Sequence, residues 1–305
     1  MKNNILICYI FILFICSLSC SQAKINVQWL PNDFQKDAFK HVEYLANLGT
    51  RDAGSVTEKK AITYIQKELE EAGLIVAVES FEIAGRMKDK ISSNIVASIK
   101  PMSNINKEII ISAHLDSYGG PGANDNGSGI GVLIELAKYF ANSKSELPYN
   151  LKFVAFGAEE LGLLGSRAYI KKHQENLHEC KLLFNMDCVG GNKNILIDMR
   201  DGIKNIPKQN GKWRLDKSAK LTASNVPEWL SDTILSVCKN LGYKITQISG
   251  QGSDHQSFAL SGIVATSIVI SRNKYSDAED TPDKVHPESL QKAGNIVANV
   301  VLEVM

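Results

Sequence analysis

The chain has 305 residues, of which 44% are hydrophobic and 22% charged, a composition typical of a globular protein and not of a disordered one. Its 34 Lys and Arg residues against 33 Asp and Glu give a net charge of +1, so there is no reason to expect a nucleic-acid partner. Beyond the N-terminus no apolar run is long enough to span a bilayer, which excludes a polytopic membrane protein.

The first residues have the layout of an export signal. Met1-Lys2 is weakly positive, residues 5–18 are apolar, and small residues precede Cys20. We therefore expect residues 1–19 to be a signal peptide that ends at a lipid-modified Cys20, followed by a tether over 20–33; the alternative is an ordinary cleaved signal. Either way we expect an exported protein, a cell-envelope lipoprotein or a periplasmic or secreted one, with the lipid as its only membrane contact.

The rest of the chain alternates between helical and strand patterns. Helices are predicted over 34–48, 55–73, 127–141, 163–175, 227–241 and 287–304. Strands are predicted over 74–83, 92–100, 107–113, 151–156, 181–187, 194–199 and 264–270. This alternation predicts one α/β domain over 34–305, a three-layer sandwich with a mostly parallel, mixed central sheet flanked by helices. The polar stretch 200–226 suggests an excursion at the sheet edge or over a site, with Trp213 as a candidate pocket wall.

Outside the leader the cysteines are Cys180, Cys188 and Cys238. An odd number without a CxxC pair argues against a disulfide framework and against a thiolate zinc site. Buried free thiols are the expectation, with Cys188 as core filler.

Metal-capable side chains fall where predicted strands end. His114 and Asp116 follow one strand, Glu159 and Glu160 a second, and Asp187 a third. In open α/β sheets, sites form outside the carboxyl ends of the strands. Histidine with carboxylates and no cysteine is typical of a catalytic zinc site.

Spacing adds roles to these residues. His114 and Asp116 are two apart, so Asp116 can accept the other ring N–H of His114 and fix its tautomer. Asp125 lies in a glycine-rich turn at a helix start, which brings its carboxylate into the site. The adjacent Glu159 and Glu160 diverge, so one can bind a metal while the other moves a proton.

The sequence also resembles a known family. The motifs are "RDAGS" at 51–55, "HLDS" at 114–117, "PGANDNGSG" at 121–129, "AEELGLLGS" at 158–166, "NMDCVG" at 185–190 and "SDHQSF" at 253–258. In this order they resemble the co-catalytic zinc exopeptidases of metallopeptidase family twenty-eight, which includes bacterial leucyl-type aminopeptidases and, more distantly, glutaminyl cyclases.

The resemblance implies two zinc ions. His114 and Asp187 would hold one, Glu160 the second, and Asp125 would bridge them; Glu159 would be the general base. Asp254 and His255 would line the substrate pocket, with helix capping as the alternative.

One ligand of the family pattern is missing, because Ser276 stands where a histidine is usual. Asp277 is the expected substitute; the alternatives are His286, or a second zinc that is weak or absent.

These features predict a zinc aminopeptidase that removes N-terminal residues from peptides. The alternatives are a glutaminyl cyclase, which shares the fold, and a non-catalytic binding module.

Overall fold

The computed structural model describes residues 26–83, 90–99, 106–143, 147–199, 225–272 and 274–305. The predicted signal peptide, Cys20 and Trp213 therefore lie outside the described residues, as do the first part of the tether, residues 20–25, and most of the stretch 200–226. None of the helices in the described part of the chain is both long and apolar enough to cross a membrane.

Eight strands form one mixed sheet in the order β1-β2-β4-β3-β5-β8-β6-β7. Their bounds are β1 Ile75–Glu82, β2 Ile91–Ile99, β3 Glu108–His114, β4 Asn150–Phe156, β5 Cys180–Met186, β6 Ile195–Asp198, β7 Ile245–Ile248 and β8 Ala265–Ile270. The central strands β4, β3, β5 and β8 run parallel to one another, while the pairs β1–β2, β2–β4 and β6–β8 are antiparallel. The predicted mixed, mostly parallel sheet is confirmed.

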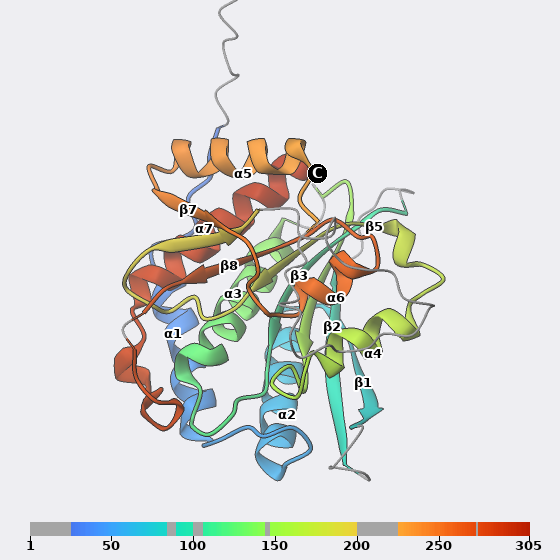
Figure 1. Ribbon diagram of the computed structural model, residues 1–305, viewed down its shortest axis with the longest axis vertical. Coiled ribbons are helices and arrows are strands. Elements are labelled where there is room, and N and C mark those ends of the chain that lie inside the picture. Colours follow the sequence, from blue (N-terminus) through green and yellow to red (C-terminus); the bar gives the residue numbers. More distant parts are fainter. Residues whose placement is uncertain (1–25, 84–89, 100–105, 144–146, 200–224, 273) are drawn as a thin grey trace, which may run out of the picture.

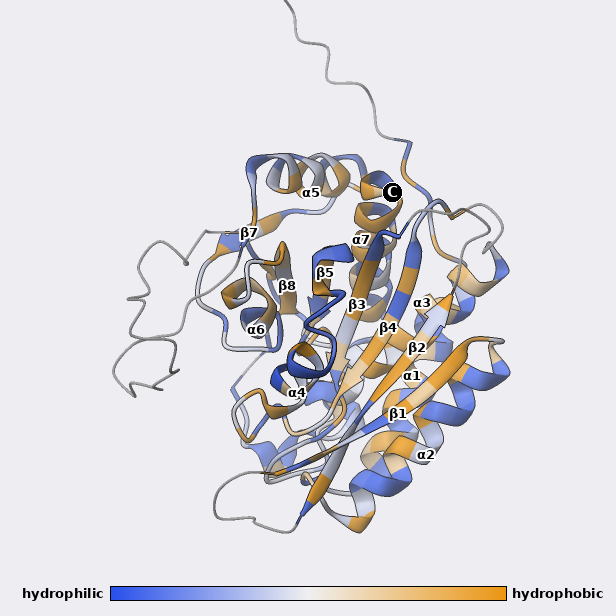
Figure 2. Cartoon of the chain, turned by 90° about the vertical axis from the view of Figure 1, so that its right-hand side faces the viewer, coloured by the Kyte–Doolittle hydropathy of each residue, from blue (hydrophilic) through white to orange (hydrophobic). Residues whose placement is uncertain are grey.

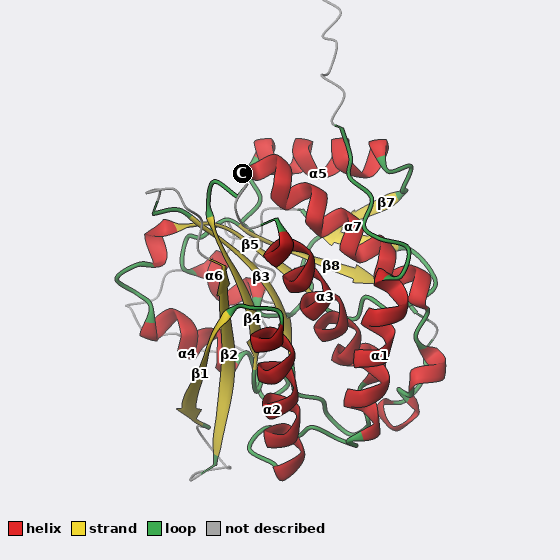
Figure 3. Ribbon diagram, turned by 180° about the vertical axis from the view of Figure 1, so that it is seen from behind, coloured by secondary structure: helices red, strands yellow, loops and turns green. Residues whose placement is uncertain are grey.

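Helices cover both faces of this sheet. They are α1 Phe34–Asn47, α2 Val56–Glu71, α3 Gly129–Asn142, α4 Leu164–Lys172, α5 Glu228–Asn240, α6 His255–Leu260 and α7 Pro287–Val304. Figure 3 shows α1, α2, α3, α5 and α7 in front of the sheet, and α4 and α6 lie on its other face (Figure 1). Seen from the side in Figure 2, these are the three layers that the alternating pattern predicts.

The strand β3 lies at the centre because its sequence is apolar on both sides. Every residue of β3 is buried, and Ile109, Ile110 and Ile111 have no exposed surface. Ile109 and Ile111 belong to the core under the larger helix layer, whereas Ile110 packs in the core under α4 and α6. A continuous apolar run is what a strand covered on both faces requires.

The start of α2 combines a local helix cap with a contact to a distant strand. Ser55 caps the helix, because its Oγ accepts the N–H of Glu58 at 3.0 Å. The Glu58 carboxylate accepts the N–H of Gly54 and the hydroxyl of Ser92, so its contacts extend beyond the local cap. Burial raises the pKa of Glu58 to about 7.

Candidate active site

The carboxyl ends of β3, β4 and β5 meet at one edge of the sheet. His114 is the last residue of β3 and pairs in register with Phe156 of β4, three residues before Glu159. Asp187 directly follows β5, which pairs with the other side of β3. The parallel register therefore brings these three side chains to one place, as the strand-end argument predicts.

Three of the predicted metal ligands form one group. His114 Nε2 lies 3.2 Å from Asp125 Oδ1 and 3.5 Å from Asp187 Oδ1, and one ligand atom from each residue lies within 4.8 Å of the other two. An imidazole and two carboxylates at this spacing are a donor set that suits zinc.

Charge at this group also suits a cation. Burial of the His114 ring lowers its pKa, but the surrounding carboxylates, with Glu159 the strongest, raise the pKa of His114 well above its ordinary value. Several carboxylates therefore focus negative potential on a buried point. A dication placed among them would relieve their mutual repulsion.

The loop that carries Asp125 is fixed from a distant part of the chain. It forms a π-helical turn, Ala123–Ser128, that leads into α3. The Asp280 carboxylate accepts the N–H of Asn124 at 3.0 and 3.2 Å and that of Asp125 at 2.8 Å. Tyr275 donates its hydroxyl to Asp280 at 3.0 Å. Asp280 is 2% exposed, so its role is to hold the backbone of the ligand loop in place.

A single amide side chain joins the Asp125 loop to the Asp187 loop. Asn126 donates from Nδ2 to the carbonyl of Met186 at 2.9 Å. Its Oδ1 accepts the N–H of Gly129 at 2.9 Å and of Cys188 at 3.2 Å. A Cβ atom at Gly129 would lie 2.4 Å from that same oxygen, which is why glycine is needed there.

The predicted base and its neighbour form a turn that Asp116 organises. The Asp116 carboxylate accepts the N–H of Glu159 at 3.0 Å and of Glu160 at 3.2 Å. It also lies 3.5 Å from His114 Nδ1, while the ring nitrogen hydrogen-bonds the Asp116 carbonyl at 3.2 Å. The contact between His114 and Asp116 thus forms through the main chain as well as the carboxylate.

Glu159 and Glu160 differ in their environments. Burial raises the pKa of Glu159 to about 10, with further contributions from Asp254 and Asp187 and an opposing one from His114. Glu160 is the more exposed of the two, and partial burial, followed by the charge of Asp125, raises its pKa to about 7. Glu160 is not part of the three-residue ligand group.

Asp254 and His255 begin α6, and they face different surroundings. Asp254 makes no side-chain capping bond, and neither of its buried carboxylate oxygens has a hydrogen-bond partner in the described part of the chain. Burial raises the pKa of Asp254 to about 7, and the charges of His114 and Asp187 also act on it, so it borders the ligand group. His255 instead points to Asp198, with 3.3 Å between Nε2 and the carboxylate.

The candidates for the missing ligand lie outside the ligand group. Ser276 and Glu279 form a capping box around the short 3-10 helix Asp277–Glu279. Asp277 is exposed, and a Cβ atom at Gly119 would lie 3.4 Å from the Cβ of Asp277. His286 is exposed and precedes α7, with its N–H donated to Gly190.

Two further residues have contacts at the site that the sequence analysis did not predict. Arg51 is fully buried, and its guanidinium donates to the carbonyls of Leu115, Pro121 and Gly122 on the loop before Asp125. Cys188, expected to be core filler, places its thiol in hydrogen-bonding contact with Asp125 and Asp187. The "RDAGS" motif pointed to Arg51, but nothing local indicated its contacts.

Comparison with known proteins places this site in a family. The aminopeptidase YwaD of Bacillus subtilis is 30% identical over 227 residues, which are 70% of this chain and 44% of that protein. The probable lipoprotein aminopeptidase LpqL of Mycobacterium tuberculosis is 32% identical over 173 residues, 56% of this chain and 33% of that protein. The chain thus spans less than half the length of these relatives.

Solved structures show the same fold. A zinc aminopeptidase from Bacillus subtilis matches with a TM-score of 0.73 and 20% identity over 88% of this chain and 94% of that one. The glutaminyl cyclase of Porphyromonas gingivalis matches with a TM-score of 0.71 and 20% identity over 89% and 98%. Residues 94–301 match Peptidase family M28. From the strand-end ligands, the sheet and this match together, we conclude that the chain is a member of peptidase family M28.

Proposed function

We propose that this protein is a zinc-dependent aminopeptidase that hydrolyses N-terminal residues from peptides. The observation that carries the proposal is the ligand group of His114, Asp125 and Asp187 beside the Glu159 carboxyl. The similarity to YwaD and LpqL, both named aminopeptidases, supports the same activity.

The residues of this chain have separate roles in the proposed reaction. Zinc at the ligand group would polarise the scissile carbonyl and make a water molecule more acidic. The positive charge of zinc would lower the raised pKa of Glu159 and leave its carboxylate ionised. Glu159 then takes the proton of the attacking water and delivers it to the leaving amine. Asp116 positions Glu159 by holding its backbone N–H. Asp254 borders the site that receives the substrate, and we assign a pocket role to Asp254 and His255.

We propose two zinc ions with unequal binding strength. His114 and Asp187 would hold the first ion, together with Asp125, since their ligand atoms lie within 4.8 Å of one another. Asp125 also contributes to the second, with Glu160 and Asp277 as its further ligands. Because Asp277 is exposed and engaged in a surface turn, the second ion should bind more weakly. The variants Asp277→Ala and His286→Ala separate the two candidates by zinc content per chain: loss in the first alone supports Asp277.

The variant Glu159→Gln tests the base, because it keeps the shape of the side chain and removes its ability to accept a proton. We expect hydrolysis of an aminoacyl amide to fall at least 100-fold, within the range typical of general-base catalysis. Zinc content should stay unchanged. Glu175→Gln, an exposed surface change, is the matched control. Activity of Glu159→Gln within tenfold of wild type would refute the assignment.

A glutaminyl cyclase is the second candidate, since a site with one well-formed ligand group also suits an enzyme that uses one zinc. Incubation with a peptide that begins with Gln distinguishes the two activities. Release of free glutamine supports the aminopeptidase. Release of ammonia with a blocked N-terminus supports the cyclase. A protein that binds zinc and catalyses neither reaction would be a binding module.

We also propose that the protein is exported and anchored through a lipid on Cys20. The similarity to LpqL, a probable lipoprotein aminopeptidase, supports this proposal. Labelling of cells with a radioactive fatty acid tests it. We expect labelled protein from the wild type and none from Cys20→Ser.

A further inference from the structure

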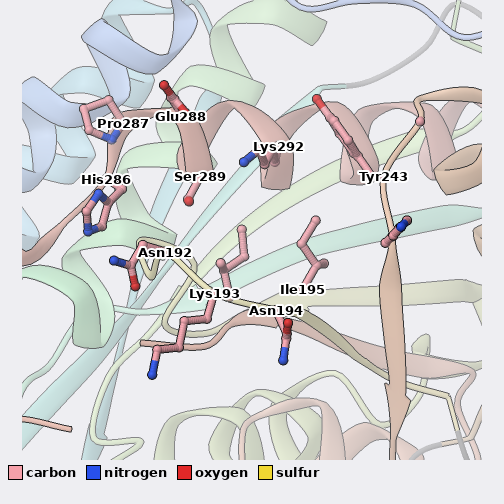
Figure 4. Close-up of a pocket in the computed structure, with 13 residues that line it drawn as sticks. Asn192, Lys193, Asn194, Ile195, Tyr243, His286, Pro287, Glu288, Ser289 and Lys292 are labelled. Carbon is pink, nitrogen blue, oxygen red and sulfur yellow. The ribbon is translucent and has the colours of Figure 1, made fainter. Parts of the chain in front are cut away.

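A cavity of about 550 Å³ lies at the start of α7, away from the ligand group. It opens between that helix, residues 192–195 at the start of β6, and residues 242–244 before β7 (Figure 4). Its volume is within the range of small-molecule sites. None of the three metal-ligand candidates lines it.

The cavity carries an excess of positive charge. Lys193, Lys244 and Lys292 line it, and no carboxylate forms an ion pair with any of them in the described part of the chain. Glu288 is the one acidic residue of the lining, and Figure 4 shows its carboxylate directed away from the side chains of Ser289 and Lys292. Three ammonium groups against one carboxylate leave an excess that matches the charge of a phosphate group.

The N-terminus of α7 adds to this positive charge. The helix has 18 residues, and His286 precedes it without a side-chain capping bond. The start of such a helix carries a positive potential. This turn adds few backbone donors, because Pro287 has no N–H and Ser289 donates its N–H to the carbonyl of His286 at 2.9 Å. Ser289 in this turn is 3% exposed, its hydroxyl has no hydrogen-bond partner among the described residues, and in Figure 4 it points into the cavity. A hydroxyl directed into a cavity can donate a hydrogen bond to an anion bound there.

We propose that this cavity binds a phosphate-bearing anion. The hydroxyl of Ser289 and the ammonium group of Lys292 hold the phosphate group, and Lys193 and Lys244 attract it at the mouth. Ile195, Ile270 and the ring of Tyr243 offer an apolar wall to the organic part. The site is separate from the proposed peptidase centre and does not depend on it.

The phosphate can come from a soluble ester or from an anionic lipid headgroup. Trp29 bears on the second source, because it is 59% exposed and contacts Tyr243 edge-on at 6.1 Å between ring centroids. An exposed tryptophan beside a basic site is an arrangement that suits the interface of a membrane.

Calorimetric titration of the zinc-loaded protein with inorganic phosphate tests the site. We expect binding that Lys292→Met and Ser289→Ala each weaken about tenfold, as the loss of a charge-assisted hydrogen bond predicts. Lys239→Met, which removes an exposed positive charge outside the cavity, should bind like wild type. Phosphate that binds to zinc contributes equally to the titrations of all variants, so it does not affect the comparison between them. No binding, or equal binding by every variant, overturns the proposal.

A second variant, Lys193→Gln, tests the site without disturbing the fold, because Lys193 is exposed. The substitution should weaken phosphate binding and leave the melting temperature unchanged. Co-sedimentation with phosphatidylglycerol vesicles identifies the source. Vesicle binding that is lost in Lys292→Met supports the site with a lipid headgroup as ligand. Binding of phosphate without vesicle binding supports it with a soluble phosphate ester. The proposed site is refuted if the protein does not bind phosphate and if Lys292→Met and Lys193→Gln bind vesicles as well as wild type does.

Discussion

Replacement of Asp280 by Asn tests whether this carboxylate sets the position of Asp125. Asp280 accepts backbone N–H groups of Asn124 and Asp125 and the hydroxyl of Tyr275. Asparagine keeps the shape but turns one acceptor oxygen into an NH₂ group that faces these donors. Hydrogen bonds to charged groups contribute roughly 1.5–3 kcal/mol each. A loss of about 2 kcal/mol in the order of the ligand loop would raise the zinc dissociation constant about thirtyfold.

Competition with a chromogenic chelator measures that constant, and urea unfolding of the metal-free protein measures fold stability separately. Asp283→Asn is the control, because Asp283 is exposed and its side chain contacts only Thr281 and Lys284 among the described residues. We expect its zinc affinity to equal that of wild type. If Asp280→Asn lowers the unfolding free energy but leaves zinc affinity unchanged, Asp280 supports the fold and does not position the ligand.

Three further perturbations follow from the same geometry. Because the pKa of His114 is raised, zinc binding near pH 7 should displace a proton from its ring. The binding enthalpy measured by calorimetry should then vary with the ionisation enthalpy of the buffer. A binding enthalpy that is the same in every buffer would contradict this. Burial raises the pKa of Glu58 from about 4.5 in the unfolded chain to about 7 in the folded protein, so the folded protein binds the extra proton and its stability falls as pH rises from about 4.5 to 7. In urea unfolding at pH 5 and pH 8, Glu58→Gln should show a smaller difference in unfolding free energy between the two pH values than wild type. An unchanged difference would argue against this. Gly129→Ala would place a Cβ 2.4 Å from Asn126 Oδ1, so we expect a loss of about 2–4 kcal/mol in unfolding free energy and reduced zinc content, with full zinc content as the contrary result.

The sequence was sufficient to place the polar side chains that follow strands. His114, Glu159 and Asp187 could be assigned to one edge because parallel strands end together, and the apolar pattern identified those strands. The short strand β7 was not predicted, since its residues are half-buried or exposed and lack an apolar run.

The residues that hold the loops were beyond prediction for a different reason. Arg51 contacts carbonyls 64 to 71 residues away, and Asp280 accepts N–H groups 155 and 156 residues away. Hydrogen bonds to main-chain atoms leave no periodicity in the sequence of either partner. The same reason explains why the spacing of Asp277 could not reveal that its segment forms a capped surface turn.

The bridge made by Asn126 has a consequence for how the metal is acquired. Because one amide ties the Asp125 loop to the end of β5, two ligands of the group stand in place through bonds that need no ion. The conformational entropy of bringing them together is therefore lost when the polypeptide folds, and little remains to be lost on binding. Small zinc domains, by contrast, fold only as the metal arrives. Such a chain can fold without the metal ion and bind it afterwards. The match between the ion and the preformed ligand geometry would then determine which metal is bound.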